Sequence, residues 1–301
     1  MIDIKQTNPK CKVLLENEFL QVEILPQDGG RIVSLVDKKN NCPLIWTNVR
    51  TENVHRYYNC DYDDLSNGGL EEAFPTVQPC VVDGLHYPFF GEIWNLEWSI
   101  KEYDDEHITL FCFSPVCAAK VIKTFFLSSE SKTLVVEYSI ENLSFKEFPY
   151  IFGFHPSFVL YKGTKLEVPD GNYDMYISPG QEEGSILSFK YPIFQGEDIS
   201  IAKDEASYVY YNFLSFPTNK GEYSVIHPFN NSGVRVNFDS NFFKCLSLWP
   251  LYGGRRGFYC LMTEAFTAWP AKLDEAIEKN HAYWIPAKEK ITTSVSYSLI
   301  N

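Results

Sequence analysis

The chain has 301 residues, and its 39 acidic side chains exceed the 26 basic ones, giving a formal net charge of -13 at pH 7. This balance disfavours nucleic acids and anionic membranes as partners, because phosphate contacts require clustered lysine and arginine. The N-terminal residues lack the basic and apolar segments of a secretion signal, and no apolar run is long enough to cross a bilayer. A cytoplasmic location is therefore expected.

Short runs of alternating or apolar residues predict β-strands along most of the chain. Turn residues end each of the early runs, which indicates a meander of short strands. Three consecutive runs at 107–113, 119–127 and 133–142 are predicted to pair in antiparallel order. The other predicted strands lie at 13–15, 20–25, 31–36, 76–82, 97–103, 151–160, 165–168, 207–213, 223–227, 234–238, 245–250, 258–266 and 291–299.

Two segments break this pattern. Residues 51–67 are polar and aperiodic, which predicts a long ordered loop, and such loops in compact domains are often functional. Residues 270–279 have a proline at the start and acidic residues within, which predicts a single short helix. No linker, charge block or repeat divides the chain. The sequence therefore predicts one all-β domain over residues 1–301.

The eight cysteines contain no CxxC pair and no cysteine-histidine spacing of the kind that binds zinc. They are expected to be reduced and mostly structural, and no metal site is predicted. The oligomeric state is left open between monomer and homodimer.

Two titratable residues stand alone in apolar surroundings. His155 lies within the aromatic run 150–158, directly before Pro156, and Glu264 lies within the strand-like run 258–266. Burial lowers the pKa of a histidine and raises that of a carboxylate, so the two could act as an acid and a base near neutral pH. Alternatively, His155 is a core histidine bonded to backbone, and Glu264 is a buried partner of Arg255 or Arg256.

Further residues are candidates for ligand contact. Arg31 begins a predicted strand, and its planar guanidinium could contact a ligand or form a surface salt bridge. Glu71 and Glu72 point in opposite directions if the chain is extended there, and Glu72 is chosen as the one facing a cleft. Trp249 could stack on a ligand ring or belong to the core. Arg255 and Arg256 could bind a phosphate or lie in an exposed turn.

Six short motifs occur in an order and at spacings that resemble those of the aldose 1-epimerase, or galactose mutarotase-like, superfamily. The similarity covers almost the whole chain. The motifs are Gly29-Gly-Arg31-Ile-Val-Ser-Leu35, Gly68-Gly-Leu-Glu-Glu72-Ala-Phe-Pro75, Phe90-Gly91-Glu92-Ile-Trp94, Gly153-Phe-His155-Pro156, Leu248-Trp249 and Thr263-Glu264-Ala-Phe-Thr267.

The resemblance implies a large antiparallel β-sandwich with a concave face that binds a monosaccharide. It implies that Glu264 is the general base for the anomeric hydroxyl and that His155 is the general acid for the ring oxygen. It implies no cofactor and no metal. The expected activity is interconversion of the α and β anomers of a sugar, and the alternative is a non-catalytic carbohydrate-binding or regulatory relative.

The sequence departs from the family pattern at two places. Many relatives carry a second histidine where this chain has Phe90, which can neither donate a hydrogen bond nor transfer a proton. His86 is the nearest substitute in sequence, unless it is only a solvated loop residue. The family also often has proline where this chain has Ala265, next to the predicted base.

Overall fold

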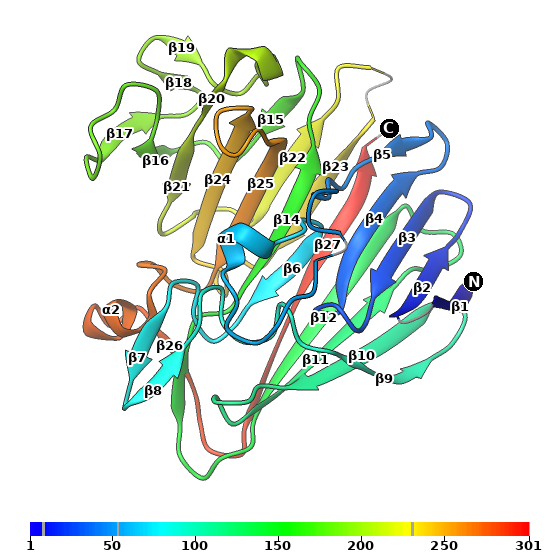
Figure 1. Cartoon of the computed structure of the whole chain (residues 1–301). Coiled ribbons are helices and arrows are strands. Elements are labelled where there is room, and N and C mark those ends of the chain that lie inside the picture. The colour runs from blue at the N-terminus through cyan, green and yellow to red at the C-terminus, as the bar shows by residue number, and fades with distance from the viewer. Residues whose placement is uncertain (8–9, 53, 230–231, 301) are drawn as a thin grey trace.

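The computed structural model describes residues 1–7, 10–52, 54–229 and 232–300. It shows two large antiparallel β-sheets packed against each other, with few and short helices, of which α1 (Tyr62–Leu65) lies in front of the larger sheet (Figure 1). The predicted all-β sandwich is confirmed. No helix in the described part of the chain has the length and apolar character of a membrane span.

The larger sheet contains the strands that form the floor of the cleft described below. Its hydrogen-bonded order is β1-β2-β3-β4-β6-β14-β25-β24-β21-β16-β17-β18-β19, with β5 paired to β4 and β20 to β24. The bounds are β1 Ile2–Thr7, β2 Lys10–Glu16, β3 Leu20–Leu25, β4 Arg31–Asp37, β5 Cys42–Pro43, β6 Leu70–Ala73, β14 Gly153–Val159, β16 Asn172–Ile177, β17 Leu187–Lys190, β18 Ile193–Phe194, β19 Glu197–Asp198, β20 Val209–Tyr210, β21 Asn212–Ser215, β24 Cys245–Tyr252 and β25 Tyr259–Phe266.

The second sheet has the order β15-β22-β23-β27-β12-β11-β10-β9. Its strands are β9 Ser99–Tyr103, β10 His107–Phe113, β11 Ala119–Phe126, β12 Thr133–Asn142, β15 Lys165–Glu167, β22 Glu222–Ile226, β23 Gly233–Phe238 and β27 Lys290–Ile300. The remaining elements are two two-stranded sheets, formed by β7 Cys80–Val82 with β8 Leu85–Tyr87 and by β13 Phe148–Tyr150 with β26 Tyr283–Ile285, and the helices α1 Tyr62–Leu65, η1 Glu205–Ser207 and α2 Leu273–Glu278.

Alternating burial along the strands explains why these residues form sheets. In β3, every second residue is buried, beginning at Leu20, and β12 shows the same period. Successive side chains of a strand point to opposite faces, so one set packs between the sheets and the other faces outward. All eight cysteines are free and buried.

The sequence prediction and the structure agree best for the alternating strands. β3, β10 and β12 have the predicted bounds, and the antiparallel order of β10, β11 and β12 is confirmed. The predicted helix at 270–279 is shorter and spans Leu273–Glu278. The predicted strand at 76–82 is wrong for its first part, because only Cys80–Val82 is a strand, and the run before it includes wall residues of the cleft.

A buried ion pair connects the two sheets. Lys123 of β11 donates to Glu72 Oε2 of β6 at 2.6 Å, and the two side chains are 0% and 1% exposed. Tyr138 of β12 donates to the other oxygen of Glu72 at 2.9 Å. The Lys123 ammonium also lies 4.8 Å from the ring centre of Trp98, a cation–π contact. Both charges are thus satisfied within the core.

The Lys123→Met substitution should lower the free energy of unfolding by about 3–5 kcal/mol, because it leaves Glu72 charged and buried without its cation. Chemical denaturation measures this loss. Lys165→Met is the matched control, because its ion pair with Glu167 is 52% and 45% exposed and such pairs contribute about 0–1 kcal/mol. Equal losses in the two variants would contradict the prediction.

Candidate functional site

A row of polar side chains crosses four adjacent strands of the larger sheet. Glu71 of β6 pairs with His155 of β14. On the other side of β14, the paired residues Phe154 with Ala265 and Ser157 with Met262 place His155 across from Glu264 of β25. Glu264 in turn pairs with Ser247 of β24. The register of these strands therefore brings together residues that are far apart in the sequence.

The period of the strand decides which residues face the cleft. Phe154 packs against Phe238 and Phe243, and Phe158 packs against Tyr223, so both point between the sheets. His155 lies between them in sequence and points to the opposite face. The aromatic run around His155 is thus explained by core packing on one side of β14, while the other side presents the imidazole.

This face of the sheet forms the base of a cleft of about 710 Å³. Such a volume lies within the range of small-molecule sites. The polar row contributes the floor, the loop containing α1 and the β24–β25 hairpin contribute one side, and the segment before β7 with the start of α2 contributes the other. The lining residues include Tyr62, Asp63, Val77, Pro79, Phe89, Phe90, His155, Asn212, Ser247, Trp249, Arg255, Met262, Glu264, Trp269, Lys272 and Glu275.

His155 and Glu264 are in direct contact at the floor of this cleft. Nε2 of His155 lies 3.1 Å from Oε1 of Glu264, and the two side chains are 3% and 15% exposed. Burial lowers the pKa of His155, but the hydrogen bond and charge of Glu264, together with the charge of Glu71, outweigh it. The pKa of His155 therefore lies above its usual value, and the imidazolium form is favoured.

Tyr62 connects His155 to a second carboxylate. Its hydroxyl oxygen lies 3.2 Å from Nδ1 of His155 and donates to Oε1 of Glu71 at 2.6 Å. Ser66 donates to the same oxygen of Glu71 at 2.9 Å. The ring of Tyr62 stacks on Phe90, with ring centres 3.9 Å apart and planes 13° apart. Burial, followed by the charge of Glu71, raises the pKa of Tyr62, which remains a neutral phenol.

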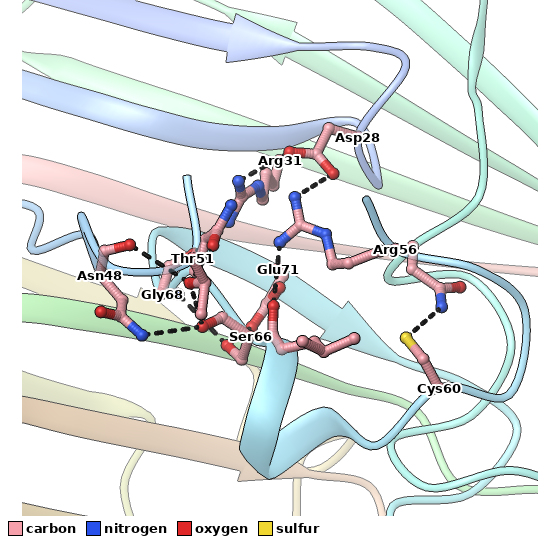
Figure 2. A network of polar contacts seen from close by, with 12 residues as sticks. Asp28, Arg31, Asn48, Thr51, Arg56, Cys60, Ser66, Gly68 and Glu71 are labelled. Carbon is pink, nitrogen blue, oxygen red and sulfur yellow. Dashed lines mark hydrogen bonds and ion pairs between the residues drawn. The ribbon is translucent and has the colours of Figure 1, made fainter. Parts of the chain in front are cut away.

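A network of charged and amide side chains holds the long loop against the larger sheet (Figure 2). Asp28 pairs with Arg31 Nη2 at 2.7 Å and also with Arg56 of the loop. Arg31 donates to the carbonyl of Gly68 at 2.9 Å, and Arg56 donates to the carbonyl of Leu65 at 3.4 Å. These contacts fix both ends of the segment that contains α1 and hence Tyr62.

Two ion pairs connect α1 to the β24–β25 hairpin. Arg255 lies 2.5 Å from Asp63, and Arg256 lies 2.7 Å from Asp64. The Arg255 guanidinium is also 5.5 Å from the ring centre of Trp249. Arg255 therefore pairs with Asp63 at the side of the cleft, and the partner of Glu264 is His155.

Comparison with known proteins identifies the fold. No protein-family model and no curated protein matches the sequence. Among solved structures, the Slr1438 protein of Synechocystis sp. PCC 6803 is similar, with 17% identity, a TM-score of 0.73 and coverage of 96% of this chain and 95% of that chain. A galactose mutarotase-like protein of Clostridium acetobutylicum has 15% identity, a TM-score of 0.71 and coverage of 100% and 98%. The chain has the galactose mutarotase-like fold. A candidate aldose 1-epimerase of Escherichia coli K12 has 16% identity, a TM-score of 0.71 and coverage of 100% and 99%.

Within this galactose mutarotase-like fold, the residues singled out from the sequence lie in different places. His155, Glu264 and Trp249 line the same cleft. The orientation expected for Glu72 is wrong: Glu72 points between the sheets to Lys123, and its neighbour Glu71 lies on the side of His155. Because side chains alternate along a strand, the two glutamates lie on opposite faces of the sheet, as expected. The alternation does not show which of the two faces borders the cleft.

The other two candidates lie outside the cleft lining. Arg31 is buried, and its guanidinium contacts Asp28 and Gly68. His86 lies on β8 and lines a neighbouring hollow with Tyr58, separated from the polar row. The residue that approaches His155 beside Phe90 is instead Tyr62. Neither Arg31 nor His86 is therefore included in the function proposed below.

Sequence reasoning did not find Tyr62 or Glu71 as members of the site. Tyr62 belongs to the polar segment 51–67, which was predicted to be a functional loop, but no local pattern distinguishes it from the other tyrosines there. Its contact with His155 spans 93 positions in the sequence. Asn212 and Ser247 were also missed; they bond to each other at 3.2 Å and extend the polar row.

The raised pKa of His155 has a consequence for stability. The stability that His155 contributes is fully present below its unfolded-state pKa of about 6.5 and is lost as the pH rises through the folded-state pKa. The difference in unfolding free energy between the wild type and His155→Gln should therefore shrink as the pH rises above about 6.5. Urea denaturation at a series of pH values checks this. A difference that grows with pH would have the wrong sign.

Proposed function

We propose that the protein is an aldose 1-epimerase-like isomerase that interconverts the α and β anomers of a monosaccharide. The observation that supports this most directly is the 3.1 Å contact between Nε2 of His155 and Oε1 of Glu264 at the floor of the cleft. The anomeric hydroxyl and the ring oxygen of a cyclic sugar are bonded to the same carbon. An acid and a base that serve these two oxygens must therefore reach neighbouring atoms, and His155 and Glu264 are close enough to do so.

The proposed reaction needs one proton removed and one delivered. Glu264 accepts the proton of the anomeric hydroxyl, and Nε2 of His155 donates a proton to the ring oxygen as the bond between that oxygen and the anomeric carbon breaks. The resulting aldehyde rotates about the adjacent carbon–carbon bond. The ring then closes on the other face of the aldehyde, with the two proton transfers reversed. The protons balance, and no oxidant or reductant is needed.

The walls of the cleft suit a sugar. Trp249, Trp269 and Phe89 offer aromatic surface to the apolar faces of a sugar ring, while Asn212 and Ser247 offer hydrogen-bonding groups beside Glu264. Lys272 and Arg255 also line the cleft, but both contact acidic side chains. A neutral monosaccharide is therefore favoured over a phosphorylated one.

Glu264→Gln should reduce anomer exchange by about 10²- to 10⁴-fold, because glutamine cannot accept the proton. Proton NMR exchange spectroscopy on a panel of reducing sugars measures the rate and identifies the substrate. Glu167→Gln is the control, because Glu167 is an exposed carboxylate on the second sheet. A Glu264→Gln variant that exchanges anomers at the wild-type rate would exclude Glu264 as the base.

Sugar binding without turnover is a second candidate function. It is favoured by Phe90, which is buried beside His155 at the place where many relatives have a second histidine. The same NMR experiment distinguishes the two functions. Signals that broaden on binding with no exchange between anomers would support binding alone, whereas a rate that depends on His155 would support catalysis.

A further inference from the structure

The polar row continues beyond the acid and base through Tyr62 to Glu71. Both ring nitrogens of His155 have an oxygen partner: Glu264 faces Nε2 at 3.1 Å and Tyr62 faces Nδ1 at 3.2 Å. Tyr62 has one hydroxyl proton, and it is donated to Glu71 at 2.6 Å. The oxygen of Tyr62 can therefore meet Nδ1 only as an acceptor.

We propose, building on the function above, that Tyr62 and Glu71 are positioning residues that keep His155 doubly protonated and direct its Nε2 proton into the cleft. An ionised Glu264 only accepts hydrogen bonds, so Nε2 bears a proton, and Tyr62 as an acceptor requires a proton on Nδ1 as well. His155 is then an imidazolium between two carboxylates. Glu71 acts through Tyr62 and does not itself touch the substrate.

This arrangement serves both halves of the reaction. When Nε2 gives its proton to the ring oxygen, His155 becomes neutral and keeps the Nδ1 proton bound to Tyr62. That tautomer leaves the lone pair on Nε2, where it can take the proton back as the ring closes. A neutral histidine with its proton on Nε2 would not be an imidazolium, so it would lack the acid form that the first proton transfer needs. The Tyr62 contact thus selects the tautomer that catalysis requires.

Glu71 is held by hydrogen bonds and lies near a buried cation. Its Oε1 accepts hydrogen bonds from both Tyr62 and Ser66. Burial, together with the neighbouring Arg56, lowers the pKa of Arg31, while Asp28 and Glu71 oppose that shift. Arg31 and Arg56 together with Asp28 stabilise the loop beside Glu71 (Figure 2).

The titratable groups that face His155 come from three elements. Glu264 approaches from β25, Glu71 from β6 and Tyr62 from α1, while Phe90 covers the ring with an apolar edge at 5.2 Å between centres. Phe90 also stacks on Tyr62 and so fixes the plane of the phenol. The place of the second histidine is thus occupied by a residue that orients Tyr62, and Tyr62 supplies the polar contact.

The chain offers a matched control for this pair. Glu72, the next residue, accepts a hydrogen bond from Tyr138 at 2.9 Å on the opposite face of β6, where both side chains are buried. Tyr138→Phe and Tyr62→Phe therefore each remove one buried phenol that donates to a glutamate. Only Tyr62→Phe also removes the oxygen that contacts Nδ1 of His155. A general effect of losing a buried hydrogen bond would be the same in both.

The test uses the full chain labelled with ¹⁵N at histidine and long-range ¹H–¹⁵N spectra recorded across a pH series. The sequence has six histidines, and the signals lost in His155→Asn assign His155. In the wild type, both ring nitrogens of His155 should be protonated at neutral pH. Tyr62→Phe and Glu71→Gln should move the titration of His155 to lower pH, and Tyr138→Phe should leave it unchanged. Glu71→Gln keeps the stacked ring, so it tests the charge even if Tyr62→Phe does not fold.

Kinetics provide the second readout. The fraction of protonated imidazole falls about tenfold for each pH unit above its pKa, so the alkaline limb of the pH–rate profile should move to lower pH in Tyr62→Phe and Glu71→Gln. A wild-type His155 that is neutral at pH 7, or a titration equal in the wild type and both variants, overturns the proposal. Absent anomer exchange with the expected NMR shifts overturns the proposed function but supports this placement of the proton.

Discussion

The antiparallel register of β6, β14 and β25 is the constraint on which the whole cleft depends. It places Glu71, His155 and Glu264 side by side on one face of the larger sheet. A slip of one residue in β14 would turn His155 into the core and bring phenylalanine to the cleft. The packing of Phe154 and Phe158 between the sheets excludes that slip. The core packing of β14 therefore also fixes the geometry of the polar row.

The loop that contains α1 adds the remaining polar contact to His155. The sheet alone would leave His155 with carboxylates on two sides and its Nδ1 uncovered. Ion pairs from Asp28 to Arg31 and Arg56, and from Arg255 to Asp63, hold the loop in place from two directions. These ion pairs order a segment whose regular structure is limited to one short helix, and ordering such a segment is costly in conformational entropy. In return, the loop brings a buried phenol within hydrogen-bonding distance of the imidazole.

The fold was more accessible from the sequence than the site. Alternating strands such as 20–25 and 133–142 were predicted with their observed bounds, because burial on one face leaves a period of two in the sequence. β6 was missed, since all four of its residues are buried and show no alternation. His155 and Glu264 stood out as lone charges in apolar runs. Tyr62 had no such contrast, and its role follows only from a contact between distant parts of the chain.

The adjacent glutamates of β6 show how surroundings decide the role of a carboxylate. Both are buried, and each accepts a hydrogen bond from a tyrosine. Glu72 meets the ammonium of Lys123 in the core, where both side chains are buried and the two charges are paired. Among the described side chains, no lysine pairs with Glu71, and its charge acts through Tyr62 on an imidazole that borders the cleft. The same side chain therefore contributes to the cohesion of the sheets at one position and to proton placement at the next.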